Sequence, residues 1–507
     1  MNNKEKVVLT GKLFCWQDVV NVARYGAKLE LSDQVWKDII NAQEIVQRII
    51  QSGDRAYGVN TGLGSLCNVS LPIEQLSKMS RNTLLSHACG VGPLLSDEQT
   101  RAIICAAIIN FSKGKSGVQK SVVEGLVALL NHGITPQVPS QGSVGYLTHM
   151  AHIGISLLGI GMVSYQGNVV SAAEALSAEG LVSVSLGAKD GLSLVNGTPC
   201  MTGLLCLAID DAARLTKWAD VISSLSFEAL KGQINCLDPD ILALKPYKGV
   251  QTVGCNLRAL LADSKNLDMN KGIRTQDALS IRSIPQIHGA IRDQLDHVIQ
   301  QANVELNSVT DNPLVLGTPD NYKVVSQANP HGESLAIAAD LLAISIAELG
   351  GVSERRLDRL VNPLVSGLPA YLVKEAGVNS GMMIVQYVAA SLCSENKRFA
   401  VPAVTDNYVT SALQEDHLSM GTVAALKVLK VLENTNKILS IEYLCAAQAC
   451  EFIALETMGE GTFKAWKLMR ENVPAYDEDR WLAPEIEKSS QLVESEQALQ
   501  TIFCNIQ

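Results

Sequence analysis

The chain has 507 residues, of which 18% are charged and 47% belong to the hydrophobic class, and its formal net charge is −10. This balance argues against a nucleic-acid-binding protein, because no basic stripe is present to neutralise phosphates. The first residues, MNNKEKVVLTGK, lack an apolar segment of signal-peptide length, and no run of about 18 uninterrupted apolar residues follows. We therefore expect a soluble, cytoplasmic protein with no membrane partner.

The twelve cysteines are scattered without a CxxC pair or a metal-ligand spacing. We expect them to be reduced thiols, mostly in the core. No stretch has the composition of a linker, so one large cooperative unit is at least as good an expectation as several domains.

Residues 1–195 are mixed in character, with helical patterns broken by glycine-rich turns and short strand-like pieces such as 161–170. From Asn196 onward long helical patterns dominate, notably over 198–230 and 424–458. We therefore divide the chain into an N-terminal active-site loop domain, 1–195, and a long-helix bundle, 196–507. The run from Leu335, LAIAADLLAISIAELGG, is apolar nearly all round, which predicts burial on every side through subunit association.

Several motifs far apart in the chain carry polar residues suited to chemistry. They are AYGVNTGLG at 56–64, LLSHACG at 84–90, GSVGYLTHMAH at 142–152, LVNGT at 194–198, TQDALSIRSIPQIHG at 275–289, SQANPHGES at 326–334, LPAYLVKEAGVNSG at 368–381 and SALQEDHLSMG at 411–421. Together they resemble the aromatic amino acid lyase family, that of the histidine and phenylalanine ammonia-lyases, from about Leu9 to about Leu492.

The resemblance implies an all-α fold, a long-helix bundle of the fumarase/aspartase-like superfamily with a mixed N-terminal region. It also implies a homotetramer whose active sites are shared between subunits, a small-molecule substrate, and no metal. It further implies that the ring-selecting residues are His87, in the pair Ser86-His87, and Glu415, both in the form of the histidine-directed members. An imidazole and a carboxylate are suitable partners for an azole ring.

Three further roles follow from the resemblance. Tyr57 is the expected catalytic base that takes the β-proton, which requires its pKa to be lowered by helix ends or cations. Asn196 is expected near the amine and carboxylate end of the substrate, and it also has the sequence position of a helix N-cap. Arg282 is expected to bind the substrate carboxylate through two hydrogen bonds, with Gln276 beside it.

The chain departs from the family's pattern at five pocket positions. Leu279 replaces a tyrosine, Pro330 replaces a phenylalanine, Tyr146 replaces an aspartate, and Lys374 stands where histidine-directed members have an acid or neutral residue. The fifth departure is a gap: Gly145 runs directly into Tyr146, without the Ala-Ser-Gly tripeptide that cyclises into the electrophilic methylidene-imidazolone group, MIO. We count the replaced residues among the substrate contacts, and Glu415 and Lys374 beside Tyr57 among the catalytic candidates.

An ammonia-lyase uses this electrophile to turn the amine into a good leaving group. A quaternary amine needs no such help, because trimethylamine leaves as a neutral molecule. We therefore predict MIO-independent elimination of trimethylamine from a histidine betaine, most simply ergothioneine, in similarity to the ergothionase branch of the family. No cofactor is expected unless Ala-Ser-Gly follows Gly145 in the natural protein.

Two alternatives stay open. The first is a histidine ammonia-lyase, converting L-histidine to urocanate and ammonia, whose tripeptide is missing from the sequence as written. The second is a non-catalytic binding homologue.

Overall fold

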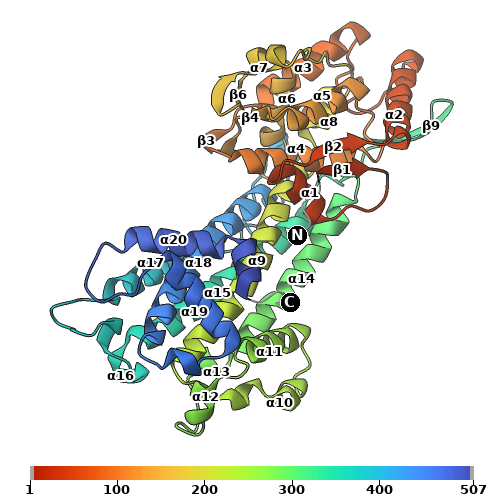
Figure 1. Ribbon diagram of the computed structural model, residues 1–507. Helices are drawn as coiled ribbons and strands as arrows, with labels where there is room; N and C mark the ends of the chain where they lie inside the picture. Colours follow the sequence, from red (N-terminus) through yellow and green to blue (C-terminus); the bar gives the residue numbers. More distant parts are fainter. Residues whose placement is uncertain (1–4, 503–507) are drawn as a thin grey trace. The chain divides into compact units, whose positions relative to one another are not determined.

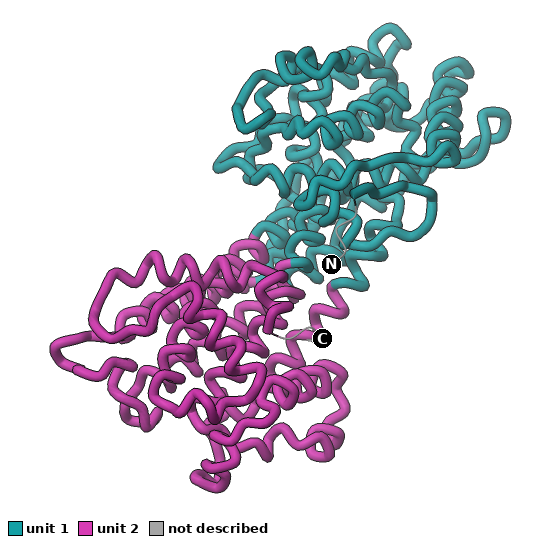
Figure 2. Tube along the Cα trace, viewed as in Figure 1, with its two compact units in different colours: residues 1–210, 299–340, 402–426 teal, residues 211–298, 341–401, 427–507 magenta. Residues whose placement is uncertain are grey.

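The computed structural model describes residues 5–502, which form two compact units (Figures 1 and 2). Unit 1 contains residues up to 210, 299–340 and 402–426, and unit 2 contains 211–298, 341–401 and the chain from 427. Both units are thus built from separated stretches of chain. The predicted division between residues 195 and 196 lies within unit 1. Four long helices contribute residues to both units: α9 (Pro199–Ala229), α14 (Ile284–Leu306), α15 (Glu333–Val361) and α18 (Gly421–Cys450).

The helices of unit 1 alone are α1 (Trp16–Ala23), α2 (Asp33–Ser52), α3 (Leu76–His87), α4 (Asp97–Phe111), α5 (Lys120–Asn131), α6 (Thr148–Leu157), α7 (Ala172–Ala178) and α8 (Asp190–Val195). Its strands are β1 (Lys6–Leu9), β2 (Lys28–Leu31), β3 (Val91–Leu94), β4 (Thr135–Pro136), β5 (Pro139–Gln141), β6 (Met162–Tyr165), β7 (Asn168–Ser171), β8 (Leu314–Thr318) and β9 (Asn321–Val325).

The strands form four small sheets. β1 and β2 pair in parallel, β3 pairs with β5, β4-β6-β7 form an antiparallel sheet, and β8 pairs with β9. The expected hairpin at 161–170 is confirmed as β6-β7. Its two turn residues, Gln166 and Gly167, both have positive φ (50° and 78°), which is the backbone twist that tight hairpins require.

Two glycines allow helices of unit 1 to pack at backbone distance. A Cβ on Gly191 of α8 would lie 2.3 Å from the carbonyl oxygen of Ser80 in α3. A Cβ on Gly203 of α9 (Pro199–Ala229) would lie 2.6 Å from the backbone of Ala102 in α4. Any larger residue would therefore force these helices apart. The first contact matters for the site, because α3 ends at His87 and α8 ends beside Asn196.

The helices shared by the two units are α9, α14 (Ile284–Leu306), α15 (Glu333–Val361) and α18 (Gly421–Cys450). Those of unit 2 alone are α10 (Pro239–Ala243), α11 (Lys248–Leu260), α12 (Lys265–Met269), α13 (Leu279–Arg282), α16 (Pro363–Ser366), α17 (Met383–Phe399), α19 (Glu460–Asn472), α20 (Ala483–Val493) and α21 (Glu496–Ile502). The helical prediction is thus confirmed, although α18 ends at Cys450 rather than at 458.

Unit 2 buries charge in its core. Arg356 Nε and Glu442 Oε1 are 2.6 Å apart, and both side chains are fully buried. Asp220 is also fully buried and lies 2.8 Å from the ring of His288. Charges without solvent need partners of this kind, because an unpaired buried ion is strongly destabilising.

Some apolar side chains on the long helices remain exposed in a single chain. Ile337 and Ile344 of α15 are 51% and 45% exposed, and Tyr387 of α17 is 60% exposed. The apolar run from Leu335 is therefore not buried on every side within one chain. Two helical stretches, 190–229 and 333–361, have the length and hydropathy of a membrane span, but all of the apolar window in the first and 67% in the second is buried inside the protein. That is the pattern of core helices. The eleven cysteines among the described residues are free thiols.

Candidate active site

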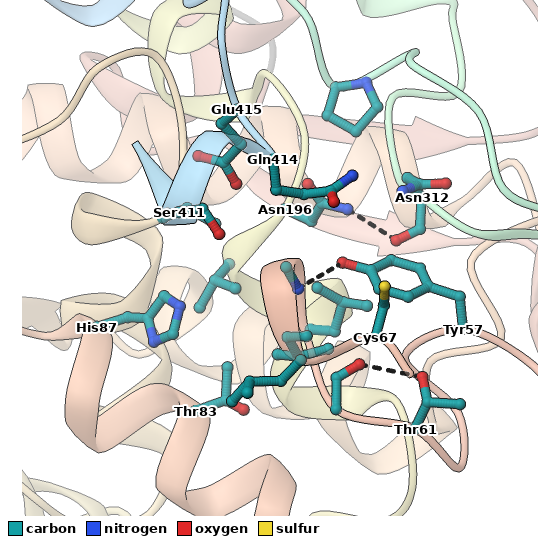
Figure 3. A pocket seen from close by; sticks show the side chains of 18 of the residues that line it. Tyr57, Thr61, Cys67, Thr83, His87, Asn196, Asn312, Ser411, Gln414 and Glu415 are labelled. Carbon is teal, nitrogen blue, oxygen red and sulfur yellow. Dashed lines mark hydrogen bonds between the residues drawn. The ribbon is translucent and has the colours of Figure 1, made fainter. Parts of the chain in front are cut away.

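A large cavity of about 1750 Å³ lies within unit 1. It is lined by the loop around Tyr57, by the end of α3, by the turn before α6, by Asn196 after α8, and by the loops 326–331 and 410–417. Six of the ten predicted site residues line it: Tyr57, His87, Tyr146, Asn196, Pro330 and Glu415. Residues up to 358 positions apart are thus brought together, and Figure 3 shows several of them around one space.

The other four predicted residues, Gln276, Leu279, Arg282 and Lys374, belong to unit 2 and do not line this cavity. Leu279 is 63% exposed. The ammonium of Lys374 forms an ion pair with Asp477 (3.3 Å) while both side chains are more than 70% exposed. Within one chain, Lys374 is therefore a solvated surface residue.

The ring-selecting pair is arranged by hydrogen bonds at the end of α3. The hydroxyl of Ser86 donates to the carbonyl of Thr83 (3.2 Å), so its oxygen accepts from Nδ1 of His87 (3.0 Å). Burial lowers the pKa of His87, although its hydrogen bond to the backbone of Thr83 and, to a smaller extent, the charge of Glu415 oppose this shift. His87 is therefore neutral at pH 7, and its Nε2 is a hydrogen-bond acceptor.

Glu415 is placed by an unusual turn. Ser411, Ala412 and Leu413 all have positive φ (51°, 51° and 71°), which costs roughly 1–2 kcal/mol for each residue with a side chain. The turn is closed by the backbone bridge between Thr410 and Glu415, and the Thr410 hydroxyl donates to Oε2 of Glu415 (2.9 Å). Local strain of this kind concentrates at functional sites.

Tyr57 lies in a tightly bonded loop at the other side of the cavity. Its hydroxyl oxygen accepts a hydrogen bond from the backbone N–H of Gly64 (3.2 Å). Burial nevertheless raises the pKa of Tyr57, and this hydrogen bond offsets the effect only in part. The expected lowering of this pKa is thus not produced by the residues of one chain.

The loop that lacks the tripeptide closes through a strained turn. Leu147 has φ 78° and ψ −73°, and the N–H of Thr148 donates to the carbonyl of Tyr146 (3.2 Å), which defines a γ-turn with positive φ. Such a turn costs about 1–3 kcal/mol. Ser143 secures the loop, because its hydroxyl donates to the carbonyl of Tyr146 (3.0 Å) and its oxygen accepts from the N–H of Gly145 (3.2 Å).

Tyr146 shares the cavity with the ring-selecting carboxylate. Burial raises the pKa of Tyr146, and the nearby negative charge of Glu415 raises it further. Tyr146 is therefore a neutral phenol at pH 7. Sequence reasoning placed Tyr146 in the site but did not predict this electrostatic effect of Glu415.

Asn196 does not cap a helix N-terminus as expected. Gly197 has φ 94°, and the first backbone hydrogen bond of α9 runs from the N–H of Thr202 to the carbonyl of Thr198, so the chain turns away before the helix starts. Asn196 instead ends α8, and its amide nitrogen donates to the carbonyl of Asn312 (2.8 Å). The predicted N-cap role of Asn196 is thus wrong.

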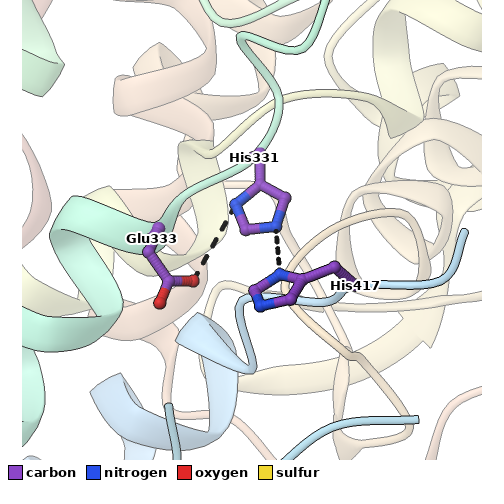
Figure 4. Close-up of side chains that lie close together, drawn as sticks. All are labelled: His331, Glu333 and His417. Atoms are coloured by element: carbon purple, nitrogen blue, oxygen red, sulfur yellow. Dashed lines mark hydrogen bonds and ion pairs between the residues drawn. The ribbon is translucent and has the colours of Figure 1, made fainter. Parts of the chain in front are cut away.

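Two histidines at one side of the cavity form a row with a carboxylate (Figure 4). His331 Nε2 and His417 Nδ1 are 3.0 Å apart, and His331 Nδ1 lies 3.9 Å from Oε2 of Glu333. Donor atoms of the three residues lie within 4.8 Å of one another. The shortest contact is a hydrogen bond between the rings, and the absence of a metal requirement stays a prediction. Sequence reasoning missed this row.

Comparisons with known proteins identify the family of this chain. A family model described as aromatic amino acid lyase matches residues 14–471. The histidine ammonia-lyase of Symbiobacterium thermophilum is 45% identical over 94% of each chain, and that of Treponema denticola is 42% identical over 98% of each chain.

Solved structures show the same fold. Histidine ammonia-lyase from Trypanosoma cruzi has a TM-score of 0.90 with 37% identity, covering 98% of this chain and 95% of that one. The ergothioneine-degrading enzyme ergothionase from Treponema denticola, in complex with desmethyl-ergothioneine sulfonic acid, has a TM-score of 0.92 with 30% identity, covering 97% and 99%.

The helical fold and the cavity define an enzyme of the fumarase-like helical superfamily. The chain belongs to the aromatic amino acid lyase family, as its resemblance predicts. It is accordingly a carbon–nitrogen lyase that acts on a small molecule.

Proposed function

We propose that this lyase eliminates an amine from a substrate that carries a histidine-type ring. The observation that supports the ring is the presence of His87 and Glu415 in one cavity. The named relatives support the same ring, since the two described above are histidine ammonia-lyases and the ergothionase structure holds an ergothioneine derivative.

For the leaving group, the comparisons favour ammonia from L-histidine. The histidine ammonia-lyases reach 45% identity, whereas the ergothionase is 30% identical. Conversion of L-histidine to urocanate and ammonia is therefore the candidate that the relatives support better. Ammonia release by this route needs an electrophile, and the sequence supplies none, because Gly145 is followed directly by Tyr146. The γ-turn at Leu147 closes the loop where the tripeptide would stand.

The second candidate is release of trimethylamine from a histidine betaine, and the same loop supports it. A trimethylammonium group has no N–H, is bulkier than a primary ammonium, and is best held by aromatic faces, at about 0.5–2 kcal/mol each. The rings of Tyr57 and Tyr146 line the open cavity and are suitable faces. Leu279, an expected substrate contact, is not among the lining residues of one chain.

The hydrogen-bonding of the ring selectors bears on the kind of ring. With the Ser86 proton donated to Thr83, Nδ1 of His87 carries the ring proton and its Nε2 is an acceptor; the carboxylate of Glu415 is a second acceptor. A ring with a proton on each nitrogen satisfies both of them, whereas neutral imidazole carries one N–H. The 2-thione ring of ergothioneine has two, which supports ergothioneine among the betaines.

We further propose that the active site is completed by neighbouring subunits of a homotetramer. The absence of Arg282, Gln276, Leu279 and Lys374 from the cavity of one chain supports this proposal, as do the exposed apolar residues of α15 and α17. Sedimentation at the concentration used for kinetics would test it, and a monomer with full activity would contradict it.

One experiment separates the candidates. The purified protein is incubated separately with L-histidine, histidine betaine and ergothioneine, while ammonia, trimethylamine and the unsaturated acid are quantified. Urocanate and ammonia from L-histidine alone would establish the ammonia-lyase. Trimethylamine from either betaine, without turnover of L-histidine, would establish the second candidate. Binding of these compounds without turnover would show a non-catalytic homologue.

A further inference from the structure

The side-chain amide of Asn196 is held in one orientation by two acceptors. Its Nδ2 donates to the backbone carbonyl of Asn312 (2.8 Å) and to Oδ1 of Asp311 (3.4 Å) (Figure 3 shows the first bond). Since neither acceptor can donate to an amide oxygen, a flipped amide would lose both bonds. The two amide protons are thereby used, and Oδ1 is the polar atom of Asn196 left for the cavity that this residue lines.

The acceptor at Asp311 is itself fixed by a buried ion pair. Lys189 Nζ and Oδ2 of Asp311 are 2.6 Å apart, and both side chains are fully buried. Ser193 bridges the pair, because it accepts from Lys189 (2.8 Å) and donates to Oδ2 of Asp311 (2.9 Å). The backbone N–H of Asn312 donates to the other carboxylate oxygen (2.7 Å). Every oxygen of the Asp311 carboxylate therefore has a fixed partner, and its charge is balanced.

We propose that Lys189 and Asp311 are positioning residues that keep the carbonyl oxygen of Asn196 turned toward the substrate's cationic nitrogen. This inference rests on the proposed function. A carbonyl oxygen attracts an ammonium or a trimethylammonium group and repels a carboxylate, so the substrate's amine lies at Asn196 and its carboxylate lies elsewhere. The family resemblance places Asn196 near both the amine and the carboxylate of the substrate. We assign it a contact with the amine alone.

A double-mutant cycle tests whether the pair acts through Asn196. The pair is neutralised as Lys189→Met with Asp311→Asn, because removing both charges avoids an unpaired buried ion. We expect kcat/KM to fall by about tenfold or more with asparagine at 196, but by about threefold or less in the Asn196→Ala background. An equal fall in both backgrounds, or no fall in either, would overturn the proposal.

A matched control removes the other fully buried pair of this kind described above, through Arg356→Met with Glu442→Gln. Its effect on kcat/KM should be the same in both backgrounds, because neither residue touches Asn196. If the Lys189 variant does not fold, Ser193→Ala is the milder probe. It should lower kcat/KM about twofold to fivefold when asparagine is kept at 196 and leave it unchanged in the Asn196→Ala background, since it only loosens the carboxylate. Additive effects of Ser193→Ala and Asn196→Ala on kcat/KM would also overturn the proposal.

The cycle remains informative if the proposed reaction is wrong. Dissociation constants for L-histidine and for ergothioneine, measured by calorimetry, then replace kcat/KM. Coupling between the two positions in binding, without turnover, would support the positioning role while refuting the lyase function. Turnover with strictly additive effects would support the lyase function and refute the positioning role.

Discussion

The phenol oxygen of Tyr57 accepts a hydrogen bond from the backbone N–H of Gly64 at 3.2 Å, within a site where burial raises the pKa of the same phenol. One backbone donor therefore does not make Tyr57 a base at neutral pH. A positive charge beyond this backbone donor is needed to stabilise the phenolate at neutral pH.

Replacing Tyr57 by phenylalanine should lower kcat by roughly 100-fold or more while substrate still binds, if Tyr57 takes the β-proton. The ionisation of the Tyr57 phenol should also determine how kcat/KM changes on the acid side of the pH profile. Because the pKa is raised, kcat/KM of the native enzyme should increase with pH through the neutral range, and this increase should vanish in the variant. Near-normal turnover by Tyr57→Phe would place the base elsewhere.

Much of this fold was predictable because its signals are local or periodic. The apolar run from Leu335 predicts a long helix, and α15 spans Glu333–Val361. His87 and Glu415 were found because each stands in a recognisable motif, and the fold brings them to one cavity.

The buried relationships were not predictable from the same signals. Lys189 and Asp311 are 122 positions apart, and each looks like an ordinary surface charge in the sequence. Asn196 is separated from the start of α9 by Gly197, whose φ is positive, and its amide is oriented by Asp311 and Asn312. The residue type alone does not predict the backbone conformation at such a position, because glycine can adopt several conformations.

Glu415→Gln should weaken ring recognition and raise KM by about tenfold, because the charged acceptor for the ring N–H becomes a neutral amide. Its hydrogen bond from Thr410 persists with an amide oxygen, so the fold should be kept. Asp406→Asn, an exposed change in the same part of the chain, is the matched control and should leave KM unchanged. A fall in kcat with constant KM would show that Glu415 transfers a proton instead.

If Arg282 of a neighbouring subunit binds the substrate carboxylate, as proposed, Arg282→Lys keeps the positive charge but loses one of the two hydrogen bonds to the carboxylate. We expect a loss of roughly 2–4 kcal/mol in transition-state binding, seen mainly in kcat/KM. Lys374→Ala should change kcat/KM by less than about threefold, since exposed ion pairs such as Lys374–Asp477 contribute little. The opposite ranking of the two variants would make Lys374 the cation that binds the carboxylate.

The pH dependence of KM should report His87. Burial lowers the pKa of this imidazole, so it stays neutral down to a pH below the ordinary histidine value. As the pH falls through that lowered pKa, protonation of Nε2 removes the acceptor, and KM should rise. The rise should be absent in His87→Gln, whose amide oxygen accepts without titrating; a KM that is flat with pH in the native enzyme would remove His87 from ring binding.

The intact mass of the purified protein should match the 54.4 kDa of the chain as written. A mass higher by Ala-Ser-Gly less two waters would show the cyclised tripeptide. That result would favour ammonia release from L-histidine and would leave no place for the γ-turn at Leu147.

The long helices also limit how this protein can be dissected. The divisions between the two units after residues 210, 298, 340 and 426 fall inside α9, α14, α15 and α18, respectively. A fragment cut at any of these points would leave up to four backbone carbonyls without their helical partners at a new helix end. Separate expression of the catalytic half is therefore expected to give insoluble material, and circular permutants should be opened in surface loops such as the β8-β9 turn instead.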